Sequence, residues 1–63
     1  MEETMKERIL QYIKYHPGCD GVDMAIDMKI YTDIAYRLID SLIEEQKIIK
    51  QYIGLETQLR IKE

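Results

Sequence analysis

The chain has few of the residues on which disulfides, metal sites and enzymatic catalysis depend. Its 63 residues include no Trp, no Phe and only one cysteine, one histidine and one proline. Cys19 has no second cysteine to pair with, and one thiol with one histidine cannot make a zinc site. No apolar run approaches the roughly 20 residues that cross a bilayer, and the acidic N-terminus is unlike a signal peptide. We therefore expect a cytoplasmic protein with no cofactor, no bound metal and no membrane partner.

What the chain does contain is typical of one small globular domain. Hydrophobic residues make up 46% and charged residues 33% of the sequence, a balance that argues against disorder. Without Trp and Phe, the core must be built from Ile, Leu, Met, Val and Tyr. A chain of this length supports one domain at most, and such domains often gain stability by forming dimers.

The first 28 residues predict two helices separated by a turn. Thr4 followed by Glu7 forms a capping-box pattern that begins a helix over residues 4–15, and Pro17 with Gly18 ends it. A short second helix is expected over 20–28, with Asp20 as its N-cap. Its expected buried face is formed by Val22, Ala25 and either Ile26 or Met28.

A third helix is expected over residues 32–46, opened by Thr32 or by Tyr31 just before it. Two adjacent apolar rows give it a wide hydrophobic sector: Ile34, Leu38 and Leu42, and beside them Ala35, Ile39 and Ile43. The second row is expected to pack in the core, and any part of it left exposed would form a dimer or partner surface. The opposite side is charged and solvated: Asp33, Arg37, Asp40 and Glu44.

After Lys47 the pattern changes from helical to strand-like. Residues 48–53 are rich in β-branched and aromatic side chains, and residues 57–62 alternate between apolar and polar side chains. The two segments are joined by a short turn that contains Gly54. This pattern predicts an antiparallel hairpin. The expected fold class is therefore α+β, with three helices followed by a C-terminal hairpin.

This order resembles the winged helix-turn-helix superfamily, in particular small bacterial, archaeal and phage-type transcriptional regulators. The run from Ile9 to Gly18 looks like the first helix and turn of such regulators. Residues 22–28 resemble their second helix, and residues 34–49 resemble their third helix entering the first strand of the wing. The chain departs from the pattern at Gln46 and Lys47, where these families often place a glycine to close the third helix.

No group of residues supports catalysis, so we expect no enzymatic activity and no small-molecule substrate. His16, Cys19 and Ser41 are each the single residue of their type, and a nucleophile needs a base and usually an orienting group beside it. Asp20, Asp23 and Asp27 form a helical stripe, which is a poor calcium cage because calcium ligands come from a flexible loop. We interpret the stripe as a solvated helix face.

The resemblance implies that the third helix enters the major groove of duplex DNA while the hairpin approaches the DNA backbone. Arg37 would pair with a guanine edge or a phosphate, and nearby hydroxyls and Lys29 would bind phosphates. The DNA-binding residues expected on this basis are Lys29, Tyr31, Thr32, Tyr36, Arg37, Lys50, Gln51, Arg60 and Lys62.

The distribution of charged residues along the chain argues against DNA binding. Residues 1–46 hold five basic and ten acidic side chains, a charge of −5, whereas residues 47–63 hold four basic and two acidic, a charge of +2. Phosphate neutralisation supplies most of non-specific DNA affinity, so a monomer should bind weakly unless a homodimer or a partner protein assists it. The alternative is an acidic winged helix that binds a basic protein partner through Asp20, Asp23 and Asp27, without contacting DNA.

Overall fold

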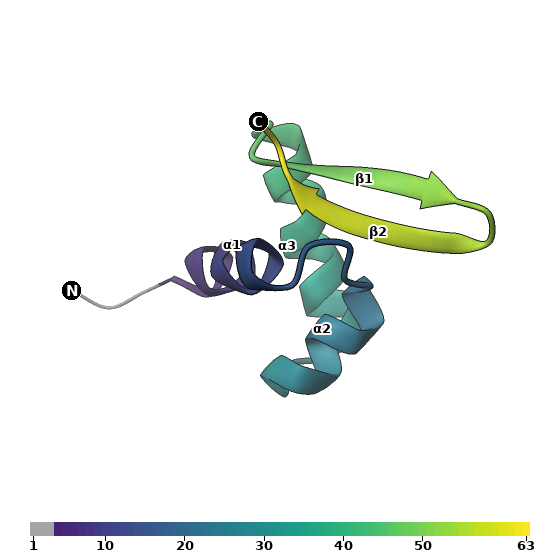
Figure 1. The fold of residues 1–63 in the computed structure, drawn as a ribbon. Coiled ribbons are helices and arrows are strands. Elements are labelled where there is room, and N and C mark those ends of the chain that lie inside the picture. The colour runs from purple at the N-terminus through teal and green to yellow at the C-terminus, as the bar shows by residue number, and fades with distance from the viewer. Residues whose placement is uncertain (1–3) are drawn as a thin grey trace.

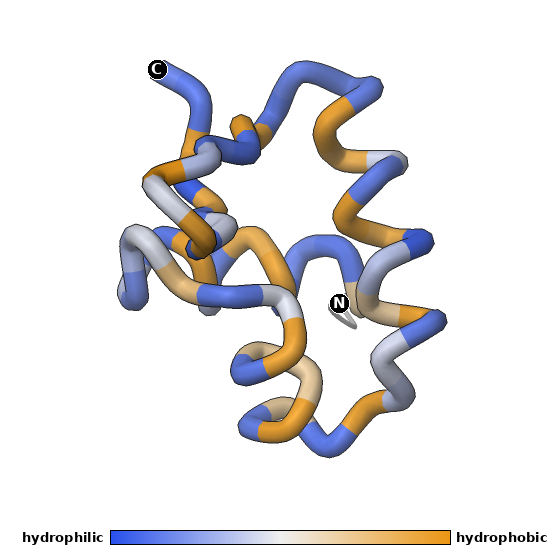
Figure 2. Tube along the Cα trace, turned by 90° about the vertical axis from the view of Figure 1, so that its right-hand side faces the viewer, coloured by the Kyte–Doolittle hydropathy of each residue, from blue (hydrophilic) through white to orange (hydrophobic). Residues whose placement is uncertain are grey.

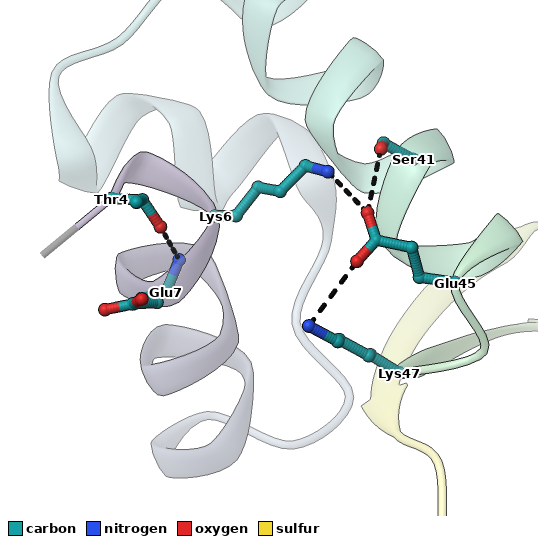
Figure 3. A network of polar contacts seen from close by, with 6 residues as sticks. All are labelled: Thr4, Lys6, Glu7, Ser41, Glu45 and Lys47. Atoms are coloured by element: carbon teal, nitrogen blue, oxygen red, sulfur yellow. Dashed lines mark hydrogen bonds and ion pairs between the residues drawn. The ribbon is translucent and has the colours of Figure 1, made fainter.

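The first helix forms where its capping residues predict. The computed structural model describes residues 4–63, and α1 spans Met5–Tyr15. Thr4 is the N-cap, and its hydroxyl accepts a hydrogen bond from the backbone N–H of Glu7 at 3.2 Å (Figure 3). The chain leaves the helix at His16 and turns at Gly18, whose φ of 85° is a left-handed conformation that suits glycine.

The second helix, α2, spans Gly21–Met28, and Asp20 caps it by accepting a hydrogen bond from the N–H of Val22 at 3.1 Å. Both features were predicted. The helix ends with Lys29 in the left-handed conformation, at a φ of 57°. The N–H groups of Lys29 and Ile30 bond back to the carbonyls of Ile26 and Ala25, which is the Schellman arrangement.

The third helix, α3, spans Thr32–Glu44 and ends two residues before the predicted boundary at 46. The reason is a second Schellman closure, in which Gln46 takes a φ of 62° and the N–H of Lys47 bonds to the carbonyl of Leu42. Gln46 thus occupies the left-handed position that favours glycine. Tyr31 is the N-cap of α3 but makes no side-chain capping bond.

The two strands form the predicted hairpin. Strand β1 spans Ile48–Ile53 as expected, and β2 spans Glu56–Ile61, one residue earlier than the predicted 57–62. The strands are antiparallel, with Ile48 opposite Ile61 and Ile53 opposite Glu56, which places Gly54 in the connecting turn. The sequence did not indicate that the segment between α1 and α2 also pairs with β2. Cys19 bridges to Leu59, and the N–H of Leu59 bonds to the carbonyl of Cys19 at 2.9 Å.

One apolar core joins all five elements. The fully buried side chains, each exposed by 1% or less, are Ile9, Ile13, Met24, Ala25, Ala35, Ile39, Leu42, Ile48 and Leu59. The hydrophobic positions of α3 turn toward the rest of the chain and its hydrophilic positions turn outward (Figure 2). Core packing of Ala35 and Ile39 is thereby confirmed, whereas Ile34 of the other predicted row is 42% exposed.

The predicted buried face of α2 is partly wrong. Val22 is 39% and Ile26 67% exposed, while Met24 and Gly21 are buried with Ala25. Gly21 allows this orientation because a Cβ there would lie 3.1 Å from Cε1 of Tyr36, and its absence lets α2 approach α3 closely. The architecture is α+β, three helices followed by a hairpin whose base lies beside α1 and the end of α3 (Figure 1). Within residues 4–63, no helix is long and apolar enough to cross a membrane.

Candidate functional site

The start of α3 presents most of the predicted polar residues to solvent. Tyr31, at the N-cap, is 77% exposed, and Thr32, Arg37 and Lys29 are also exposed. Tyr36 differs because it is half-buried and packs against Gly21. Four of the five residues predicted here are thus free to contact a ligand, and Tyr36 is mainly a packing residue with an accessible edge.

The outward face of α3 is acidic. Asp33, Arg37, Asp40 and Glu44 follow one another at three- and four-residue spacing, and all four are exposed. Three carboxylates therefore share this face with one guanidinium group. A phosphate approaching Arg37 would meet a carboxylate on the adjacent turns, and exposed like charges repel.

The hairpin does not bring its predicted binding residues together. Side chains alternate between the two faces of a strand, so Lys50 lies on the face that carries the buried Ile48 and Leu59. Its ammonium group lies 6.0 Å from the ring centre of Tyr36 and 5.9 Å from that of Tyr52. The Lys50 side chain therefore lies on the side of the hairpin that faces α3.

Gln51 and Arg60 lie on the opposite face. The Arg60 guanidinium donates to the side-chain oxygens of Gln51 at 3.2 Å and Gln58 at 3.0 Å. Lys62 follows the end of β2 and donates to the side chain of Gln46 at 3.0 Å. Lys50, Arg60 and Lys62 therefore do not form one basic surface beside α3.

The tip of the hairpin is apolar. Tyr52 is 73%, Ile53 53% and Leu55 fully exposed, and no residue from 52 to 57 is basic. Three of the four basic side chains of residues 47–63, Lys47, Arg60 and Lys62, lie at the base of the hairpin, where the chain leaves α3 and where β2 ends, whereas the ammonium group of Lys50 lies 5.9 Å from the ring centre of Tyr52. Most of the positive charge counted for this segment thus lies away from the tip.

The exposed face of α2 combines carboxylates with branched apolar side chains. Val22 and Ile26 are one helical turn apart, and Asp23 and Asp27 follow them directly in the sequence. Asp27 accepts a hydrogen bond from the Tyr12 hydroxyl at 2.6 Å, and this bond raises the pKa of Tyr12 to about 12. The sequence pattern identified the carboxylates but assigned Val22, and either Ile26 or Met28, to the buried face; Met28 packs against the core and Ile26 does not.

The single histidine and the single cysteine have structural contacts. The His16 ring lies 4.4 Å from the ring of Tyr12, centre to centre, and tilted against it. Cys19 is half-buried, and burial raises the pKa of its thiol. From residue 4 onward, no three His, Cys, Asp or Glu side chains are close enough together to hold a metal ion.

Comparison of the chain with protein-family models, curated proteins and solved structures finds no match.

Proposed function

We propose that this chain is a winged helix-turn-helix domain that works as a protein-interaction module and binds its partner through the exposed face of α2. The order of three helices and a hairpin supports the winged-helix fold, as does the pairing of the segment between α1 and α2 with β2. A cytoplasmic location is part of the proposal, because a single half-buried thiol suits a reducing compartment.

The observation that carries this proposal is the acidity of the outward face of α3. The winged-helix resemblance implies that the start of this helix faces the major groove and that the hairpin approaches the DNA backbone. Here the face has three carboxylates to one guanidinium, and the tip has no basic residue. Phosphates would be repelled where a DNA-binding domain attracts them.

The α2 face has the chemistry to bind a protein segment that is basic and apolar. Within the described chain, no cation forms an ion pair with Asp20, Asp23 or Asp27, so their charge is available to a partner. Val22 and Ile26 add apolar area that gains free energy when it is covered. Carboxylates set the partner's charge and orientation, and the branched side chains contribute affinity.

A direct test uses a synthetic helical peptide that carries Lys and Leu on one face. The wild-type chain should bind it more weakly as salt rises, and should bind poorly to the same peptide with Ser in place of Leu. The D23K/D27K variant should lose binding. The D33K/D40K variant makes the same change of charge on α3 and should retain it, and equal loss in both variants would contradict a site on α2.

Duplex DNA is the second candidate, favoured by the exposure of Lys29, Tyr31, Thr32 and Arg37 around the start of α3. In this reading Arg37 contacts a base edge or a phosphate and the hydroxyls bind phosphates. A pool of random duplexes at low salt tests it. Binding that is lost in R37A would support DNA as the ligand, and no binding at tens of micromolar protein would exclude it.

A further inference from the structure

A groove lies between α1 and the base of the hairpin, away from the α2 face. Its volume is about 1150 Å³, and its apolar lining comes from Leu10, Ile13, Pro17, Ile49 and Ile61. Ile13 is fully buried, so it belongs to the floor, whereas Leu10, Ile49 and Ile61 are half-buried and accessible. The groove therefore offers exposed apolar area in a concave setting, which favours a side chain from another molecule.

Four cationic side chains also line the groove: Lys14, Lys47, Arg60 and Lys62. Glu63 is the one carboxylate among the lining residues. Lys47 forms an ion pair with Glu45 at 3.4 Å. Arg60 and Lys62 donate to neutral amide oxygens, and among residues 4–63 neither they nor Lys14 form an ion pair. The groove thus keeps a net positive charge.

The α2 face is complementary to this groove in both charge and polarity. It carries three carboxylates, from Asp20, Asp23 and Asp27, beside the exposed Val22 and Ile26, and α2 contains no basic residue. From this complementarity we infer that the groove binds α2 of a second copy of this chain. The inference rests on the proposed function, since it identifies the partner of the α2 face.

The positions of the two surfaces determine the kind of assembly. None of the residues that line the groove belongs to α2. Figure 1 places α2 at the lower end of the molecule, below α1, and the base of the hairpin above α1. A chain that docks its α2 into a neighbour's groove leaves its own groove open. The contact is therefore heterologous and builds either a closed ring or an open chain of copies.

Sedimentation equilibrium over a range of protein concentrations tests this inference with two charge variants. K14E/K62E reverses charge in the groove, and D23K/D27K reverses it on α2. Each variant alone should associate at least about tenfold more weakly than wild type, because attractive contacts become repulsive. An equimolar mixture of the two should recover association, since each reversed surface then meets its complement.

Circular dichroism and thermal unfolding establish that the variants fold, and D33K/D40K is the matched control that should associate like wild type. A wild-type chain that stays monomeric at high concentration would overturn the inference. So would association that survives both reversals, no recovery on mixing, or native mass spectrometry showing a small molecule that wild type retains and K14E/K62E does not. If association fails but the Lys-Leu peptide still binds α2, the proposed function stands and this inference falls.

Discussion

The base and the tip of the hairpin are built from the same two strands, yet their surroundings differ in almost every respect. At the base, Ile48 and Leu59 are buried and Cys19 pairs with β2. At the tip, Ile53 and Leu55 are exposed. Lys47, Arg60 and Lys62 lie at the base, and no residue from 52 to 57 is basic. A hairpin whose base is anchored and basic and whose tip is apolar is poorly suited to contact phosphates with its tip.

This contrast shows that the net charge of a sequence segment does not give the charge of the surface to which its residues contribute. Lys14 belongs to the acidic helical part of the chain but lines the same groove as Lys47, Arg60 and Lys62. Glu56 belongs to the basic part but lies at the tip, opposite Ile53. Counting along the sequence gives the net charge of each part of the chain but not the surface on which each charge lies.

The largest expected effect is the difference in stability loss between truncating a leucine at the base of the hairpin and truncating one at its tip. Leu59→Ala should lower the free energy of unfolding by about 2–5 kcal/mol, because it leaves a cavity in a packed core. Leu55→Ala should change it by less than about 0.5 kcal/mol, because Leu55 is fully exposed. Urea denaturation followed by circular dichroism measures both. Equal losses would show that the tip is packed and would remove the contrast.

A smaller effect is expected where the backbone is the same but the residue types differ. Gln46 at the base and Gly54 at the tip both have a φ of 62°. Gln46→Gly should stabilise the domain by up to about 1 kcal/mol, reduced by loss of the hydrogen bond from Lys62. Gly54→Gln should destabilise it by about 1 kcal/mol through backbone strain alone, since no atom lies within 4 Å of the added Cβ. Thermal unfolding of both variants would reveal shifts of opposite sign; shifts of the same sign would contradict this explanation.

The smallest expected effect concerns the carboxylate at the base. Glu45 accepts hydrogen bonds from Lys6 and from Ser41, and it pairs with Lys47 (Figure 3). The bond from Lys6 lowers the pKa of Glu45 below its ordinary value. Its stabilising contribution should therefore be present above the ordinary glutamate pKa and be lost as pH falls through the lower folded value.

Melting temperatures of wild type and E45Q should thus differ at neutral pH and converge in acid. High salt should reduce the difference, because the network is at the surface. A difference that grows as pH falls would have the wrong sign for this account.

The sequence predicted the elements well because their local signals are strong. Thr4 and Asp20 cap their helices as expected, since a hydroxyl or carboxylate before a helix satisfies its free N–H groups. The end of α3 was placed too late because no glycine marks it. Gln46 adopts the left-handed conformation without the residue type that usually signals it.

The surfaces were less predictable because they depend on how elements pack. A helix of eight residues has too few turns for periodicity to fix its buried side, and the missing Cβ of Gly21 allows the close packing against α3 that α2 adopts. Val22 and Ile26 therefore became surface residues. The hairpin alternation correctly separated Leu59 from Arg60, but which face meets α3 follows from tertiary contacts. No local signal indicated that Lys14 and Lys62 line the same groove.

We propose that the acidic surfaces of the domain select a protein partner over DNA. Titrating one labelled preparation of the chain, in one low-salt buffer, with the Lys-Leu peptide and with random-sequence duplex tests it most directly. We predict saturable peptide binding that D23K/D27K abolishes, no duplex binding by wild type, and a gain of salt-dependent duplex binding in D33K/D40K as the repulsion from α3 is removed. Duplex binding by wild type that is lost in R37A, with no peptide binding, would contradict the account.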